Sequence, residues 1–148
     1  MARTPYSYPA RLMPDEEGRV VVHFPDLPEA LTDGADEAEA LAEASDCLST
    51  ALAARIVNNE DIPSPSRVRA GQYLVAPDAT VALKAALYSA LRARKMTIAD
   101  LARRLNVDDR KAARLIHPRA VSSLSSLEAA LSVLGYTIAI EVNEKPAA

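Results

Sequence analysis

The spacing of apolar residues changes along the chain and divides it into a strand-rich part and a helical part. Near the beginning, Val20, Val22 and Phe24 fall at every second position, which is the period of a strand. Val21 and His23 lie between them and would point to the opposite face. In the second half, apolar residues recur mainly every three or four positions, as along one face of a helix. The pattern predicts an α+β protein.

The first part predicts a small β-β-β-α-β unit. Strands are expected over residues 7–12, 19–24, 29–32 and 71–75, and a helix over residues 36–58. Gly18 supplies the turn between the first two strands, and Asp33-Gly34 closes the third. Asp36, with Glu39 three residues later, resembles a helix-capping pair. A right-handed crossover through the helix would bring the last strand back to the sheet.

Two short helices joined by a turn are predicted over residues 97–116. Thr97 can cap the first helix, whose inward positions end at Leu105. Asn106 breaks the apolar pattern, and Asp108 offers a second cap before a helix that ends near Ile116. Two helices of this length with a short turn make a helix-turn-helix unit.

The outer face of the second short helix is basic. Arg110, Lys111 and Arg114 lie one turn apart or adjacent, where a recognition helix needs donors for phosphates and base edges. The predicted DNA contacts are Thr97, Arg110, Lys111, Arg114 and Arg119. The alternative is an ordinary helical pair with a solvated basic face. One departure is acidic: Asp109 beside this face would repel phosphate.

Further helices are predicted on either side, through residues 81–95 and 122–134, and Gly135 stops the second of these. The segment Tyr136–Val142 then alternates as a strand does. A lone strand has unpaired backbone groups, so the same strand of a second copy is the expected partner. Such a homodimer would present two recognition helices to a two-fold operator.

Charge separates the two parts. Residues 1–76 carry 6 Lys and Arg against 13 Asp and Glu, a net −7, and residues 77–148 carry 11 against 7, a net +4. We therefore expect two domains, 1–76 and 77–148, that face different partners. No stretch of eighteen apolar residues and no signal-like N-terminal segment is present, so no membrane contact and a cytoplasmic location are expected.

Candidate catalytic chemistry is absent from the pattern. His23 and His117 fall in different parts and are read as a sheet residue and a helix-end residue. The single cysteine, Cys47, lies beside the apolar stripe of the long helix and is read as a packed residue. With four glycines and no phosphate-binding loop, we expect no enzyme activity, no cofactor and no metal.

The segment Phe24-Pro25-Asp26-Leu27-Pro28 has two interpretations, one structural and one functional. It is a strand terminus, because two prolines interrupt a ladder. It is also a rigid, acid-bearing loop of the kind that docks a protein at low entropic cost.

Several stretches together resemble HicB antitoxins. They are Y-x-A-R at 8–11, V-V-V-H-F-P-D-L-P at 20–28, T-D-G at 32–34, I-P-S-P-S at 62–66, L-A-R-R-L at 101–105, R-L-I-H-P-R at 114–119 and A-L-S-V-L-G at 130–135. The resemblance covers roughly residues 6–142. It implies a partial RNase H-like N-terminal domain without nuclease activity and an all-α helix-turn-helix domain with a C-terminal strand.

The resemblance also implies two partners. The N-terminal domain would neutralise a small HicA-like toxin, an mRNA interferase, and the second domain would bind and repress the promoter of its own operon. An acidic inhibitor suits a basic, RNA-binding toxin. The expected toxin contacts are Phe24, Pro25, Asp26, Leu27, Pro28, Glu39 and Glu43.

Two other functions fit the pattern. A stand-alone transcriptional repressor could use its acidic first domain to sense a ligand or a protein, and a neighbouring gene for a small basic protein would argue against it. An inactive nuclease-like scaffold without DNA affinity is the third reading. Salt-dependent binding to promoter fragments would exclude that scaffold.

Overall fold

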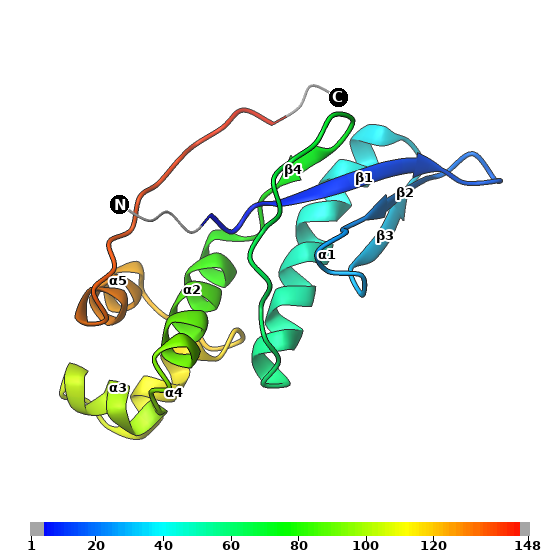
Figure 1. Cartoon of the computed structure of the whole chain (residues 1–148). Helices are drawn as coiled ribbons and strands as arrows, with labels where there is room; N and C mark the ends of the chain where they lie inside the picture. Colours follow the sequence, from blue (N-terminus) through cyan, green and yellow to red (C-terminus); the bar gives the residue numbers. More distant parts are fainter. Residues whose placement is uncertain (1–4, 146–148) are drawn as a thin grey trace. The chain divides into compact units, whose positions relative to one another are not determined.

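A computed structural model describes residues 5–145 of the chain. Its four strands form one sheet in the order β3-β2-β1-β4, and every neighbouring pair is antiparallel (Figure 1). The strands are β1 (Tyr8–Pro14), β2 (Val20–His23), β3 (Leu31–Gly34) and β4 (Tyr73–Val75). The predicted α+β class and the β-β-β-α-β order are therefore confirmed.

The connection through the long helix differs from the prediction. Because each neighbouring pair is antiparallel, β3 and β4 run in opposite directions at opposite edges of the sheet. The predicted right-handed crossover, a rule for parallel strands, is wrong here. The helix α1 (Glu37–Val57) instead lies in the chain between these two antiparallel edge strands.

One face of the sheet is buried against α1. Tyr8, Ala10, Val22 and Val75 lie on this face by their register and are at most 7% exposed. The helix contributes a buried stripe of Ala40, Ala44, Leu48, Ala51 and Leu52. The Tyr73 hydroxyl also hydrogen-bonds the Glu37 carboxylate. Alternation in the strands and the helical period of α1 together make a two-layer core.

The second half is helical, as predicted. Its helices are α2 (Ala79–Ala93), α3 (Ile98–Leu105), α4 (Asp109–Ile116) and α5 (Leu124–Val133). Helices α3, α4 and α5 contact one another around a core of Leu101, Ala102, Ala112, Leu115, Leu127, Ala130 and Leu131.

Four of the five helices in the described chain end in the same way. Each is followed by a residue with positive φ: Asn59, Lys95, Asn106 and Gly135. After α2, for example, the N–H of Met96 reaches the Leu91 carbonyl (2.9 Å) and the N–H of Lys95 reaches the Arg92 carbonyl (3.1 Å). This is the Schellman motif, which satisfies the last carbonyls of a helix.

The predicted strand at Tyr136–Val142 is not formed in this chain. Residues 136–145 have no regular secondary structure, and Ile140 and Val142 are 75% and 90% exposed. A strand needs a neighbour to bond its N–H and C=O groups, and no strand of the described chain pairs with this segment.

The contacts divide the chain into two compact units. Among the described residues, the first holds 5–52, 63–79 and 143–145, and the second holds Ala53–Ile62 and Thr80–Val142. The end of α1 and the segment after it thus belong with the helical unit, through Tyr88 Oη donating to the Glu60 carbonyl (2.7 Å) and Arg92 pairing with Asp61 (2.6 Å). The functional boundary at residues 76 and 77 stays a prediction.

Candidate nucleic-acid interface and partner surface

The start and end of α3 follow from single residues. Thr97 accepts a hydrogen bond from the Asp100 N–H (3.1 Å) and donates its own N–H to the Asp100 carboxylate (2.8 Å), a reciprocal capping box. These bonds hold the pKa of Asp100 below its usual value, since they favour the charged carboxylate. At the other end, Asn106 adopts φ 55° and ψ 48°, a conformation that Asn tolerates better than most residues.

The cap of α4 is the predicted one. Asp108 accepts a hydrogen bond from the Lys111 N–H at 2.7 Å. Asp109 is the first residue of the helix, and a carboxylate there is stabilised by the helix dipole. That gives a structural reason for an acidic residue so close to the basic face.

Three of the predicted DNA contacts lie together on α4. Arg110, Lys111 and Arg114 are exposed, and within residues 5–145 their side chains form no ion pair or hydrogen bond. The opposite side of α4 is anchored by Ala112, Leu115 and Ile116, at most 8% exposed. Because the opposite side of α4 is packed in the core, the helix is held in place while these three cationic side chains stay free. They can bind phosphates without first breaking internal contacts.

The other two predicted contacts lie outside this helix. Thr97 is exposed at the N-terminus of α3, where its hydroxyl serves as a cap. Arg119 follows α4 and is exposed, and its N–H donates to Nδ1 of His117 (3.2 Å).

A buried lysine behind α4 was missed by sequence reasoning. Lys84 of α2 is 0% exposed, and its ammonium donates to the carbonyls of Arg114 (3.0 Å), His117 (2.7 Å) and Ala120 (2.8 Å). A fourth contact joins it to Ser122 Oγ (3.1 Å). The available signal was its position, three residues after Val81 and three before Leu87, inside an apolar helix face.

The predicted docking loop divides into buried and exposed residues. Phe24 and Leu27 are 0% exposed and belong to the core of the first unit. Asp26 accepts hydrogen bonds from the N–H (2.8 Å) and the hydroxyl of Ser66, so it ties this loop to the I-P-S-P-S segment. Within residues 24–28 Pro25 and Pro28 are exposed and Asp26 is half-buried, so these three are the residues of the loop that a partner could contact.

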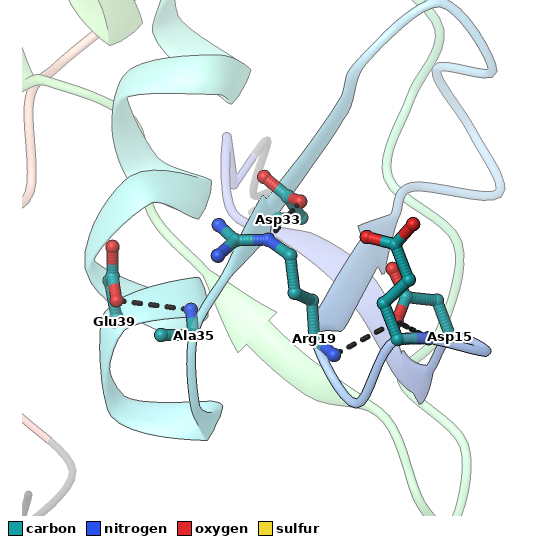
Figure 2. A network of polar contacts seen from close by, with 6 residues as sticks. Asp15, Arg19, Asp33, Ala35 and Glu39 are labelled. Carbon is teal, nitrogen blue, oxygen red and sulfur yellow. Dashed lines mark hydrogen bonds and ion pairs between the residues drawn. The ribbon is translucent and has the colours of Figure 1, made fainter.

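The acidic residues of α1 differ in what they do. Glu39 accepts from the Ala35 N–H (3.0 Å), which supports the start of the helix (Figure 2). Nearby, Arg19 pairs with Asp33 (2.7 Å) and donates its N–H to Asp15 (2.8 Å), which links the hairpin to β3. Glu43 is exposed, and no partner holds it within the described residues.

The second face of the sheet, called the open sheet face below, carries exposed apolar side chains, although Pro9 of β1 lies on the same face and is buried. Three large apolar side chains on this face are exposed: Met13 of β1 (58%), Leu31 of β3 (61%) and Leu74 of β4 (60%). Apolar side chains of strands are usually at least half-buried. His23, half-buried at the end of β2, also falls on this face by its register. Apolar side chains from separate strands on one exposed face are typical of a protein-docking surface.

Two properties hold across the described chain. Residues 5–145 contain no group of three or more His, Cys, Asp or Glu side chains arranged to hold a metal ion. No helix among them is long and apolar enough to cross a bilayer.

Comparison with known proteins identifies the family. A family described as HicB_like antitoxin of bacterial toxin-antitoxin system matches residues 7–86. Antitoxin HicB 1 of Photorhabdus laumondii subsp. laumondii is 36% identical over 135 residues, which is 91% of this chain and 86% of the relative. The chain belongs to the HicB antitoxin family. Antitoxin HicB of Escherichia coli K12 is 33% identical over 133 residues, covering 90% of this chain and 96% of the relative.

The family match covers the first unit and the start of the helical part. Residues 7–86 contain the whole sheet, α1 and the first half of α2, including Lys84. The similarity to the two antitoxins spans about nine-tenths of the chain and so extends over most of the helical unit as well. The T-D-G motif of this HicB-like chain also has a structural reason, because Gly34 lies directly against the first turn of α1.

Proposed function

We propose that this HicB-family antitoxin has two separable activities: it neutralises a HicA-like mRNA interferase through its first unit and represses its own operon through its second. The observation that carries the proposal is the exposed basic face of α4 on a unit distinct from the one with the open sheet face. Both the toxin's mRNA targets and the promoter lie in the cytoplasm, where we place the protein.

For operator binding, α4 serves as the recognition helix. Arg110, Lys111 and Arg114 would enter the major groove, where Arg and Lys read guanine and hold phosphates. Thr97 at the N-terminus of α3 and Arg119 after α4 would contact the flanking backbone, since helix N-termini and arginines both suit phosphate.

The test is a mobility shift with the promoter fragment of the chain's own gene. Arg114→Ala should weaken binding by about tenfold, since one base-edge contact contributes about 1–3 kcal/mol. The slope of log affinity against log salt should fall by about 0.9 for each phosphate that the variant no longer neutralises. Arg67→Ala removes the same charge from the first unit and should change neither quantity. Equal losses in both variants would contradict the assignment to α4.

For toxin neutralisation, the open sheet face and the adjoining loop form the binding surface. Leu31 and Leu74 supply exposed apolar area on the outer strands of the sheet. Pro25, Asp26 and Pro28 of the loop remain contacts proposed from sequence. Glu39 and Glu43 lie on α1, which covers the opposite face of the sheet, so we propose them as charges that steer a basic toxin and not as part of this contact surface.

The matching test is co-purification with the product of the adjacent toxin gene. Leu31→Asp and Leu74→Asp should each abolish capture, because they place a charge in the apolar contact. Leu124→Asp changes a leucine of the helical unit that is 55% exposed and should leave capture intact. Full capture by both sheet variants would show that the toxin binds elsewhere.

Self-association is proposed through Tyr136–Val142. Ile140 and Val142 are exposed apolar residues on a segment with no strand partner in the described chain, and pairing with a second copy would satisfy both. Light scattering at micromolar concentration should give the mass of two or more chains. Ile140→Asp should lower that mass, and an unchanged mass would place the interface elsewhere.

A further inference from the structure

Helix α4 ends differently from the other four helices of the described chain. Its last residue is followed by His117 with φ −65° and ψ 122°, so no left-handed residue closes the helix. The cause is Pro118, because a residue before proline is pushed out of the helical region. Without a Schellman motif, the carbonyls at the end of α4 need donors from elsewhere.

Lys84 provides those donors from another helix. Its ammonium reaches the carbonyl of Arg114 in the last turn of α4 and the carbonyls of His117 and Ala120 in the following loop, all within 3.0 Å. Ser122 Oγ contacts both the ammonium (3.1 Å) and the Arg114 carbonyl (3.3 Å). One side chain therefore fixes the end of α4 and the loop that follows it.

The geometry requires the charged form of Lys84. Three carbonyl acceptors need three N–H groups, and only the ammonium has three. The end of a helix carries the negative pole of its dipole, which favours a cation there. Burial, and then the charge of Arg114, lower the pKa of Lys84. Each N–H of the buried Lys84 ammonium thus has a carbonyl acceptor, and such a satisfied network holds its members rigidly.

We propose that Lys84 is a positioning residue for DNA recognition: it holds α4 in the orientation that presents Arg110, Lys111 and Arg114 together to the major groove. The inference rests on the proposed operator binding. Arg114 links the two roles directly, because its backbone carbonyl is bound by Lys84 and its side chain lies on the basic face. Without Lys84 the three cations remain on the surface, and only their fixed orientation is lost.

The test compares specific with non-specific DNA binding in the full chain. Lys84→Met keeps the length of the side chain and removes its donors. We expect affinity for the promoter duplex to fall by about tenfold or more, while affinity for a scrambled duplex of equal length changes less than about twofold. Hydrogen exchange should accelerate in α4 and residues 117–122 and remain slow in α5.

Tyr88→Phe is the matched control. It removes another buried donor from α2, one turn further along, whose acceptor is the Glu60 carbonyl and not α4. This variant should keep the ratio of promoter to scrambled affinity. A general loss of stability would lower the affinities for both duplexes together and leave their ratio unchanged, whereas a positioning role lowers the ratio in Lys84→Met alone.

A milder variant covers the case in which Lys84→Met does not fold. Ser122→Ala removes one of the four partners of the ammonium, and we expect a smaller loss of the ratio, about threefold, with faster exchange at the end of α4. If the wild-type chain discriminates between the duplexes and the folded variants discriminate equally well, the role of Lys84 is refuted and operator binding stands. If the wild-type chain does not discriminate, operator recognition fails and this inference fails with it.

Discussion

Replacing Gly34 by alanine should destabilise the first unit more than its small size suggests. Gly34 ends β3, where the strand meets the first turn of α1. A Cβ atom added there would lie 2.3 Å from the Ala40 nitrogen, 2.7 Å from its Cα and 2.8 Å from the Glu39 carbonyl carbon. All three are backbone atoms, so no side-chain rotation relieves the overlap.

The cost follows from what would have to move. On one side, Gly34 is paired with Val20 in the sheet. On the other, the start of α1 is held by Asp36, which accepts from the Glu39 N–H at 2.9 Å. Overpacking a core costs about 1–3 kcal/mol and occasionally more. With backbone on both sides, we expect about 3 kcal/mol, a large share of a typical total of about 5–15 kcal/mol.

Urea unfolding followed by circular dichroism measures this loss. Gly71→Ala is the control, because Gly71 has φ +80° with nothing within 4 Å of an added Cβ. It should lose only the cost of a left-handed alanine, about 1–2 kcal/mol. A midpoint for Gly34→Ala equal to or above that of Gly71→Ala would refute the close-packing argument.

Three further variants or treatments test local features. Lys95→Gly should raise the free energy of unfolding by about 0.5–1 kcal/mol, because Lys95 has φ 53° at the end of α2, and a thermal melt would reveal no gain if this strain is absent. Asp100→Asn should be less stable than the wild type near pH 7, and the difference should shrink below about pH 4. A carboxylate whose pKa is lowered in the folded state stabilises the fold above its unfolded pKa. That stabilisation is lost as pH falls through the folded pKa. A pH-independent difference would contradict the role of its charge. Burial raises the pKa of Cys47, so its alkylation at pH 8 should be about tenfold slower than in urea, and equal rates would show an accessible thiolate.

The sequence was most informative where one residue type decides the backbone. Thr97 and Asp108 were predicted as caps from residue type and position, and both accept the expected backbone N–H groups. The alternation predicted that Val22 and Phe24 share one face, and both are buried. Caps and strand alternation depend on residues close together in the sequence, so both can be predicted without knowledge of the tertiary structure.

The features that the sequence did not predict depend on distant contacts. Lys84 looks like a solvated lysine until the carbonyls at the end of α4, thirty residues later, are placed beside it. Phe24 and Leu27 were predicted as toxin contacts, yet both are buried. The pattern at Tyr136–Val142 indicates strand propensity, but pairing requires a neighbour that the described part of the chain does not provide.

We propose that toxin neutralisation and DNA binding reside on separate surfaces of one chain. The decisive experiment is the growth of cells that express the adjacent toxin gene, with the antitoxin supplied from a promoter that it does not control. We expect wild type and Arg114→Ala to protect these cells equally and Leu31→Asp to fail. If folded Arg114→Ala fails to protect, or Leu31→Asp protects fully, the two activities do not reside on separate surfaces.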